Sequence, residues 1–541
     1  MTQIQFKRAD TADEMEQIHR LNHSIFAEEI GQHPKTEDGH LIDRFHDRNL
    51  YFVGCKDGEV IGMVSVHDGP EFSVASRLRD ASQLAALRAP LEVRLLAIRP
   101  EFRNRTVLAG LFWQVNEYAK SHRYSDLLIS GIAERQAMYT KMGFRAMGAP
   151  VACGSAKFVP MRLPLEDAIP EFNTRQALYG SRWQREHALS LLPGPVALSA
   201  AVVNAFERPP VSHRSRAFLA DYEDTRAQLA RLMGGMRSVI LGGSGTLAND
   251  AVAANLRAAF GDAEGLVVAN GEFGERLIRQ AAAAGLRFEN LRFHWGAAWD
   301  FAVIERALER RPAWVWAVHL ETSTGVLNDV ARLSARSAEC GAAVAADCVS
   351  SIGAVDTAGI GEGLFLASGV SGKALGSFAG LAFVFVSEAA IDCLQGKLLC
   401  PTFDLIEAVR TRGPVSTVSS PLLMAVHEAL REKYSSCAAR TERFEDYAEL
   451  GRWTRTQIRA VGLVPLAAEE NAAPTITTFA LPASGFVRDC LRAGFRIAHE
   501  SEYLRKRAWG QIATMGDLDR AGLEPLFAAL QADAEMVTQA V

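Results

Sequence analysis

The sequence lacks the features that mark metal-binding, secreted or membrane-spanning chains. Its eight cysteines form no CxxC pair and no Cys/His group with metal-ligand spacing, so we predict reduced thiols and no metal site. The amino-terminal segment is charged, and no run of about eighteen consecutive apolar residues follows it. We therefore expect a cytoplasmic protein.

An excess of charge of one sign is also missing. The formal net charge is −5 over 541 residues, and no block of Lys and Arg stands out. This balance argues against nucleic acid or an anionic membrane as a partner. The chain is 48% hydrophobic and 22% charged, as in ordinary globular proteins, and it is too long for one core. We expect small-molecule chemistry in two or three domains.

Residues 1–165 show a mixed succession of short elements. The pattern predicts helices near Thr11–Glu28 and from about Thr106 to His122, a hairpin of Tyr51–Cys55 with Val60–His67, and strands at Leu91–Ile98 and Asp126–Gly131. Residues 166–190 are rich in charged and aromatic side chains and carry no strand signal, so we interpret them as a linker.

Beyond the linker, apolar runs alternate with Ala-rich helical stretches. The runs are Ser238–Leu241, Gly265–Ala269, Trp314–His319, Ala343–Ala346 and Leu381–Val386. This alternation predicts an α/β domain with a mostly parallel sheet over residues 191–400. Residues 401–541 are mainly helical, with a small α+β domain that includes Thr475–Ala480 and Phe495–Ala498.

Three stretches of the α/β region carry residues suited to chemistry. Leu241-Gly-Gly-Ser-Gly-Thr leads into a helix and is either a plain turn or an anion site, because the first helical turn has free N–H groups. Asp347 follows an apolar run, where a carboxylate needs a cationic partner such as a protonated pyridine nitrogen. Lys373 lies among small residues and is either solvated or, with its charge suppressed, a nucleophile.

Taken in order, these stretches resemble the class V aminotransferases of the fold-type-I pyridoxal-phosphate family, particularly the alanine–glyoxylate and 2-aminoethylphosphonate branches. The resemblance covers roughly residues 191–530 and includes Leu192-Pro-Gly-Pro, Asn270-Gly-Glu-Phe-Gly-Glu and His319-Leu-Glu-Thr-Ser-Thr-Gly. It implies a homodimeric aminotransferase that uses pyridoxal 5'-phosphate and acts on a small amino donor and an oxo acceptor.

The resemblance also implies roles for single residues. Lys373 would hold the cofactor as a Schiff base and shuttle the proton, Asp347 would pair with the pyridine nitrogen, and Phe273 would stack on the ring. The other cofactor contacts that it implies are Ser244, Gly245, Thr246, Thr322 and Val349, with Thr417 and Ser419 reaching the phosphate of the neighbouring subunit.

One residue of the family pattern is missing. Members that bind an α-amino acid usually carry an arginine in an Arg-Ile-Gly-like stretch, where this chain has Gln511. A neutral amide cannot form a bidentate ion pair with a carboxylate. Either Arg505 or Arg507 takes over substrate binding, or the substrate lacks an ordinary α-carboxylate.

Residues 1–165 resemble the GNAT acyltransferases, especially the N-acyl amino acid and acyl-homoserine-lactone synthases, through Glu92-Val-Arg-Leu-Leu-Ala-Ile-Arg-Pro-Glu-Phe-Arg and the helix after it. The resemblance implies an acyl-CoA or acyl-carrier-protein thioester near Ile98, Arg103 and Arg105, with Tyr139 protonating the leaving thiolate. The loop after Arg103 lacks the glycines of that family, which would let a pyrophosphate approach closely.

Three hypotheses follow from the sequence. The chain is a bifunctional enzyme that transaminates and also acylates an amine, or an aminotransferase with a non-catalytic, regulatory GNAT-like domain, or a pyridoxal-phosphate-dependent lyase or desulfurase. Phe273 argues against a desulfurase, because those relatives commonly have histidine at the stacking position.

Overall fold

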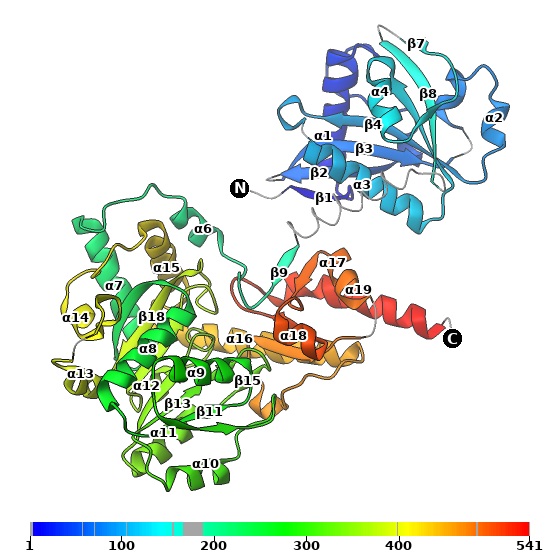
Figure 1. Ribbon diagram of the computed structural model, residues 1–541. Helices are drawn as coiled ribbons and strands as arrows, with labels where there is room; N and C mark the ends of the chain where they lie inside the picture. The colour runs from blue at the N-terminus through cyan, green and yellow to red at the C-terminus, as the bar shows by residue number, and fades with distance from the viewer. Residues whose placement is uncertain are drawn as a thin grey trace. The chain divides into compact units, whose positions relative to one another are not determined.

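The computed structural model describes residues 4–56, 58–69, 71–103, 105–153, 156–165, 188–397, 399–482 and 485–539. The chain divides into two units, Met1–His187 and Ala188–Val541 (Figure 1). Most of the predicted linker, residues 166–187, lies outside the described residues. Its last residues enter a strand of the second unit, β9 (Leu189–Leu191).

The first unit is built on one eight-stranded sheet in the order β1-β2-β3-β4-β5-β8-β6, with β7 beside β8. The strands are β1 (Gln5–Arg8), β2 (Leu50–Lys56), β3 (Glu59–His67), β4 (Pro90–Ile98), β5 (Asp126–Ile132), β6 (Arg145–Ala146), β7 (Val151–Cys153) and β8 (Ala156–Pro164). The helices are α1 (Ala12–Asn22), α2 (Ser82–Ala85), α3 (Arg105–Ser121) and α4 (Gln136–Lys141), and a π-helical turn, His23–Glu29, continues α1. The predicted hairpin is confirmed as β2 and β3.

Strands β4 and β5 diverge. They pair in parallel only across Pro90–Glu92 and Asp126–Leu128, after which β4 follows β3 and β5 follows β8. The β3–β4 ladder shifts register so that Leu95 and Leu96 face Val64 alone, and Leu95 has a φ of 51°. An extra residue of this kind bends a strand and increases its twist. The bulge thus lies in the stretch of β4 that no longer pairs with β5.

A seven-stranded sheet forms the centre of the second unit, in the order β10-β18-β17-β16-β13-β11-β12. Strand β18 is antiparallel to both its neighbours, and the other neighbouring pairs are parallel. The strands are β10 (Arg237–Gly243), β11 (Gly265–Ala269), β12 (Phe288–Arg292), β13 (Trp314–Val318), β16 (Ala343–Asp347), β17 (Leu366–Val370) and β18 (Gly380–Val386). The predicted α/β fold with a mostly parallel sheet is confirmed.

Helices cover both faces of this sheet, because its central strands are apolar on both sides. One face packs against α7 (Arg216–Leu232), α10 (Phe301–Leu308), α11 (Val330–Glu339), α12 (Ala358–Gly361) and α15 (Ser420–Lys433). The other packs against α8 (Gly245–Phe260), α9 (Glu272–Ala283), α13 (Glu388–Leu394) and α14 (Leu405–Arg410). The short helix α6 (Ala200–Phe206) packs on α15. Functional side chains are thereby left to the loops at the strand ends.

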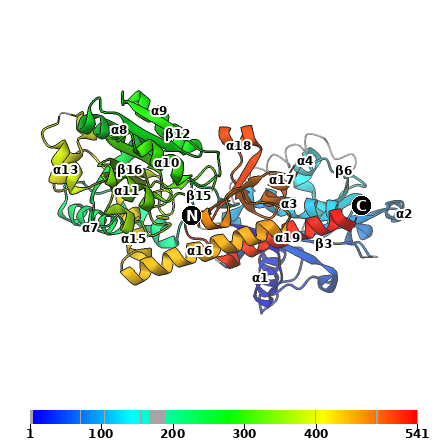
Figure 2. The same cartoon turned by 90° about the horizontal axis from the view of Figure 1, so that it is seen from below.

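The carboxyl-terminal part is a smaller α+β arrangement, as predicted. Strand β19 (Ile476–Ala480) pairs with β21 (Trp509–Ala513), and β20 (Phe495–Ile497) pairs with β9. The helices are α16 (Cys437–Ala460), α17 (Phe486–Arg492), α18 (Glu502–Arg507) and α19 (Arg520–Gln539). The two longest of these, α16 and α19, run side by side (Figure 2). Within the described ranges, no helix has the length and apolar character needed to cross a membrane.

The sequence analysis did not predict six strands of the second unit: β9, β14 (Leu320–Glu321) and β15 (Val326–Leu327), which have two or three residues each, and β12, β17 and β21. β12 is a half-exposed edge strand with polar residues, β17 contains Ser368 and Gly369, and β21 is only five residues long. The local sequence of β12, β17 and β21 has no clear apolar pattern, so these segments become strands because they pair with neighbouring strands.

Candidate active site

Lys373 lies in the loop between β17 and β18, at the end of the sheet where the parallel strands terminate. The carbonyl of the next residue, Ala374, accepts hydrogen bonds from the hydroxyls of Tyr434 and Tyr447, at 3.0 and 2.8 Å. At Gly372 a Cβ would come within 2.7 Å of the Ala379 backbone, so only glycine fits. The lysine backbone is therefore held firmly, while its half-buried side chain projects from the loop.

Burial lowers the pKa of Lys373 to about 8, an effect that Asp347 opposes and the charge of Arg276 reinforces. A lysine with a pKa near neutrality is deprotonated in a useful fraction of molecules and can act as a nucleophile or a base.

Asp347 ends β16, directly beside β17, so the parallel pairing brings it to the same edge as Lys373. Its carboxylate accepts hydrogen bonds from Asn249 Nδ2 at 2.8 Å and from the Val349 N–H at 2.9 Å. Ser368 Oγ donates in turn to Asn249 Oδ1 at 2.6 Å. Burial raises the pKa of Asp347, and these donors and the charge of Lys373 oppose that rise. The carboxylate is thus buried with neutral hydrogen-bond partners and favours an additional cation.

Phe273 is the second residue of α9, and the Lys373 ammonium lies 6.0 Å from the centroid of its ring. The start of α9 is held by Glu321, a fully buried residue of β14 (Leu320–Glu321). The Glu321 carboxylate accepts hydrogen bonds from the N–H groups of Phe273 and Gly274, at 3.3 and 3.0 Å. A carboxylate at the amino end of a helix also interacts favourably with the helix dipole. Glu321 thereby fixes the position of the Phe273 ring.

Ser244, Gly245 and Thr246 lie where β10 passes into α8. Ser244 caps the helix by accepting from the Leu247 N–H at 3.5 Å, and both Ser244 and Thr246 are exposed. At Gly245 a Cβ would come within 2.8 Å of the Val349 side chain. The turn is therefore tightly packed against the Asp347 segment, yet the exposed Thr246 hydroxyl and the N–H groups of Gly245 and Thr246 make no hydrogen bond to another described residue and are open to an anion.

Gln511 is fully buried in β21, and its amide is saturated. Nε2 donates to the carbonyls of Thr322 and Ser323 and to Thr478 Oγ1, at 2.6, 3.1 and 2.8 Å. Oε1 accepts from the Tyr503 hydroxyl at 3.2 Å. The side chain thus joins the small sheet to the Thr322 turn, and no group of it is left for a ligand.

The other sequence-predicted residues of this unit are more scattered. Thr322 is buried with its hydroxyl 2.5 Å from that of Ser350. Arg507 is stacked 3.5 Å from the centroid of the Trp295 ring, and Arg505 is exposed on α18. Thr417 and Ser419 are exposed just before α15, and neither hydroxyl bonds to another described residue.

In the first unit, Arg103 is engaged by other groups of the protein. Its Nε donates to the carbonyl of Ile98, the last residue of β4, at 3.0 Å, and its Nη1 donates to Glu29 at 2.7 Å. Arg105 begins α3, and its side chain is outside the description. Tyr139 in α4 packs so closely on Gly131 that a Cβ there would lie 2.7 Å from the ring. Burial raises the pKa of Tyr139, which keeps its hydroxyl protonated at neutral pH.

Comparison with known sequences shows to which family the second unit is related. The family "Aminotransferase class-V" matches residues 199–399. A 2-aminoethylphosphonate–pyruvate transaminase of Aeromonas hydrophila is 30% identical over 54% of this chain and 80% of its own length. The soluble hydrogenase 42 kDa subunit of Anabaena cylindrica is also 30% identical, over 57% of this chain and 82% of its own. The chain belongs to the class V aminotransferases.

Two further comparisons extend this result. An alanine–glyoxylate aminotransferase from Nostoc sp. superposes on this class V aminotransferase with a TM-score of 0.58 and 26% identity, covering 64% of this chain and 95% of the other. The family "N-acyl amino acid synthase FeeM" matches residues 17–164, within the first unit. A class V aminotransferase is here joined to a synthase-like domain.

Class V aminotransferases imply pyridoxal phosphate, and the residues present fit that group. Asp347 is a buried carboxylate without a cationic hydrogen-bond partner, which suits a protonated ring nitrogen. Phe273 offers an aromatic face near Lys373, and the Ser244 turn offers a helix amino end for a phosphate.

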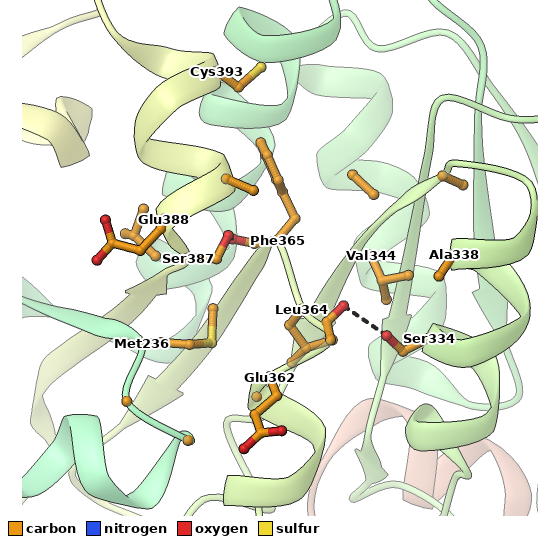
Figure 3. A pocket seen from close by; sticks show the side chains of 18 of the residues that line it. Met236, Ser334, Ala338, Val344, Glu362, Leu364, Phe365, Ser387, Glu388 and Cys393 are labelled. Atoms are coloured by element: carbon orange, nitrogen blue, oxygen red, sulfur yellow. Dashed lines mark hydrogen bonds between the residues drawn. The ribbon is translucent and has the colours of Figure 1, made fainter.

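A separate cavity of about 690 Å³ opens at the opposite edge of the sheet, where β16 begins and β18 ends (Figure 3). Its walls are largely apolar, with Met236, Val344 and Phe365 among them, and Ser334 Oγ donates to the Gly363 carbonyl at 2.7 Å. It contains none of the residues gathered around Lys373, because the length of the strands separates the two edges.

Sequence reasoning missed several residues that the structure brings to these sites. Asn249 could have been found as a polar residue on the buried, Ala-rich face of α8, and Glu321 stands inside the quoted His319 motif. In the first unit, Glu92 is fully buried, with His67 Nε2 at 3.0 Å and the Ser73 hydroxyl at 2.7 Å. Such a buried carboxylate has no local sequence signal, because its partners lie on other strands and turns.

Proposed function

We propose that the second unit transfers an amino group between a small-molecule donor and an oxo acceptor, with Lys373 and Asp347 as its catalytic residues. The observation that carries the proposal is the convergence of the Lys373 loop, the Asp347 carboxylate and the Phe273 ring at one edge of the sheet. When bound, pyridoxal phosphate supplies an electron sink for the carbon that carries the amino group.

Each residue has a role that follows from its surroundings. Asp347 holds a proton on the ring nitrogen of the cofactor through its negative charge, and Asn249 orients the carboxylate for that contact. Lys373, with a pKa of about 8, would move the proton from the amino-bearing carbon of the substrate to the cofactor carbon that takes over the amino group, and in the reverse direction with the oxo acceptor. Phe273 orients the ring by stacking.

The phosphate contacts divide between two subunits in this proposal. Ser244, Gly245 and Thr246 bind the phosphate through hydroxyl and N–H groups, with Val349 packed behind the turn. Thr322 would donate a hydrogen bond near the ring oxygen of the cofactor. Thr417 and Ser419 are exposed, as residues that reach into the site of a neighbouring subunit must be, and we therefore propose a homodimer.

The absorption spectrum of the bound cofactor tests this function. An amino donor should convert the cofactor to pyridoxamine phosphate, measured by chromatography after its release from the protein. Lys373→Ala should abolish both the visible absorption band and the conversion, whereas Lys397→Ala, an exposed lysine further along the chain, should change neither. An unchanged band in Lys373→Ala would place the attachment at another lysine.

The same assay separates amino transfer from the other chemistries open to such a site. Release of a side-chain fragment or of sulfide, without formation of pyridoxamine phosphate, would make the unit a lyase or a desulfurase. Phe273, instead of a histidine at the stacking position, favours amino transfer over desulfuration.

We also propose that the first unit acylates an amine with an acyl-CoA or acyl-carrier-protein thioester, using a GNAT-like arrangement. The match to N-acyl amino acid synthases supports it, as does the divergence of β4 from β5, which leaves the two strands unpaired with each other beyond Glu92 and Leu128. Tyr139 would protonate the leaving thiolate. Ile98 and Arg105 border the region in which the thioester would lie, whereas Arg103 must first release Glu29.

Thiol release from an acyl thioester, followed in the full-length chain with a panel of amines, tests the second proposal. Tyr139→Phe should reduce the rate at least about tenfold, within the usual contribution of a general acid. Tyr124→Phe, whose hydroxyl donates to Asp68 instead, serves as the control. If no amine is acylated, the first unit is a binding or regulatory domain.

A further inference from the structure

We propose that Arg276 binds the acid group of the amino substrate, an inference that rests on the aminotransferase function proposed above. The substrate would then be an amine that also carries a carboxylate, a phosphonate or a sulfonate. Because Gln511 stands where the family pattern has its arginine, the sequence predicts that either Arg505 or Arg507 takes over this role or the substrate lacks an ordinary α-carboxylate.

Arg276 lies one helical turn after Phe273 on α9, so the two side chains share a face of the helix. The Arg276 guanidinium carbon is 4.7 Å from the centroid of the Phe273 ring, and the Lys373 ammonium is 6.0 Å from the same centroid. The Phe273 ring therefore lies near both cations, and the charge of Arg276 acts on Lys373. A substrate whose amino carbon is at Lys373 can thus present an acid group to Arg276 across the face of this ring.

The Arg276 guanidinium is partly engaged and partly available. Its Nε donates to Glu272 Oε1 at 3.0 Å, it makes no other hydrogen bond to a described side chain, and 43% of the side chain is exposed. Glu272 also accepts from Arg279 Nη2 at 3.0 Å. One carboxylate is thus shared by two arginines, which leaves a local excess of positive charge. The terminal nitrogens of Arg276 can form a paired hydrogen bond with a carboxylate or phosphonate.

The alternative residues are less well placed. Gln511 is neutral, buried and saturated, and its contact with Tyr503 holds that ring 6.5 Å from Phe273, in an edge-on arrangement. Gln511 thus shapes the wall of the site without facing it. The guanidinium face of Arg507 is covered by Trp295. The structure records no contact of Arg505 with Phe273 or with Lys373 among the residues it describes.

Binding of acids that cannot react tests the assignment without turnover. Propanoate, ethylphosphonate and ethanesulfonate lack an amine, and their dissociation constants for the holoenzyme are measured by isothermal titration calorimetry, with propan-1-ol as the neutral probe. We expect Arg276→Gln to weaken binding of the preferred acid at least about tenfold, as for loss of a charge-assisted bond. Arg276→Lys should be intermediate, because lysine keeps the charge but loses the paired geometry.

Arg279→Gln is the matched control, because Arg279 shares Glu272 with Arg276 but is more exposed, at 61% of its side chain. It should leave the dissociation constants within about twofold, the ordinary effect of a surface charge. Circular dichroism and cofactor content verify that each variant is folded. The ranking of the three acids then identifies the preferred acid group.

Three results would overturn the assignment: unchanged affinity in Arg276→Gln, a loss of affinity confined to Arg505→Gln or Arg507→Gln, or no saturable binding of any of the three acids. Acid binding that depends on Arg276 in a protein that transfers no amino group would instead count against the proposed function alone. With a productive donor, Arg276→Gln should raise KM by a larger factor than it lowers kcat.

Discussion

Asp347 illustrates how a single residue gains its chemistry from neutral neighbours. Its carboxylate is buried, its hydrogen bonds come from an amide side chain and a backbone N–H, and Lys373 supplies the nearby positive charge. Since a buried carboxylate is costly without a cation, this environment favours a protonated group beside it. At the residue scale, the proposed site is therefore primarily an electrostatic arrangement.

Asp347→Asn should keep the shape of the site but remove the charge that holds a proton on the cofactor ring. We expect the rate of cofactor conversion by an amino donor to fall at least about a hundredfold, corresponding to about 3 kcal/mol in the barrier. Stopped-flow absorbance measures this rate. Ser368→Ala should have a much smaller effect, because it removes only the hydroxyl that donates to Asn249, which in turn donates to Asp347. Equal rates for Asp347→Asn and wild type would remove Asp347 from the mechanism.

His319 should make the protein sensitive to acid. It is 6% exposed, and burial lowers its pKa to about 4, so the folded state holds the neutral form. This contribution to stability is complete above the ordinary pKa of histidine and is lost as the pH falls towards 4. Between pH 7 and pH 5 the wild type should lose about 2 kcal/mol more unfolding free energy than His319→Gln. Urea denaturation at pH 7 and at pH 5 measures the difference. Equal losses of unfolding free energy in the wild type and in His319→Gln would contradict the effect of burial on His319.

At the scale of elements, the proposed site depends on how two helices begin. The first turn of α8 is packed on Val349 through Gly245, and the first turn of α9 is held by Glu321. Helix amino ends carry unpaired N–H groups, and the two ends are used differently. At α9 the Glu321 carboxylate accepts from these groups and positions Phe273 and Arg276. At α8 Ser244 caps only the Leu247 N–H, and the N–H groups before it are open to a phosphate.

Gly245→Ala should weaken cofactor binding at least about tenfold, because the new methyl group would lie 2.8 Å from the Val349 side chain and displace the turn. Fluorescence titration of the cofactor-free protein measures the dissociation constant. Val349→Ala removes the clash, so the double variant should recover most of the affinity. If the double variant binds the cofactor as weakly as Gly245→Ala, the loss of affinity does not come from the contact with the Val349 side chain.

Glu321→Ala should destabilise the protein by about 2–3 kcal/mol, because the N–H groups of Phe273 and Gly274 would lose their buried acceptor. Glu321→Gln retains one accepting oxygen and should cost less. Urea denaturation of the three proteins gives the order. A Glu321→Ala protein as stable as wild type would show that the amino end of α9 does not depend on this carboxylate.

The whole molecule combines a class V aminotransferase with a synthase-like domain. One family model matches residues 17–164, about 150 residues, and another matches residues 199–399. The residues that we assign to the Lys373 site all belong to the second unit, and Thr417 and Ser419 among them are assigned to the phosphate site of a neighbouring subunit. The assembly state of the chain is therefore part of the proposed site rather than a separate property.

Mixing two inactive variants tests that assembly. Subunits with Lys373→Ala lack the nucleophile, and subunits with Thr417→Ala and Ser419→Ala lack the proposed contacts to the neighbour. In a mixed homodimer one of the two sites receives only intact residues, so random reassembly should restore up to about a quarter of the wild-type activity. If the double variant is fully active, or if mixing restores nothing, the two residues do not complete a neighbouring site.

Local patterns in the sequence were sufficient to predict much of the fold of the second unit and several residues of its proposed site. Apolar runs and alternation predict the central strands and the parallel sheet, because both depend on residues close in the chain. The Ser244 turn, Asp347 and Lys373 also stand out locally, as a polar or charged residue at the end of an apolar run. The tertiary structure decided what depends on contacts between distant segments: the pairing of β17 with β16, the pairing of β21 with β19, the hydrogen bond from Asn249 to Asp347, and the burial of Gln511. It also placed Arg276 beside Phe273 and Lys373, because the position of α9 against the loop after β17 is set by packing rather than by sequence spacing.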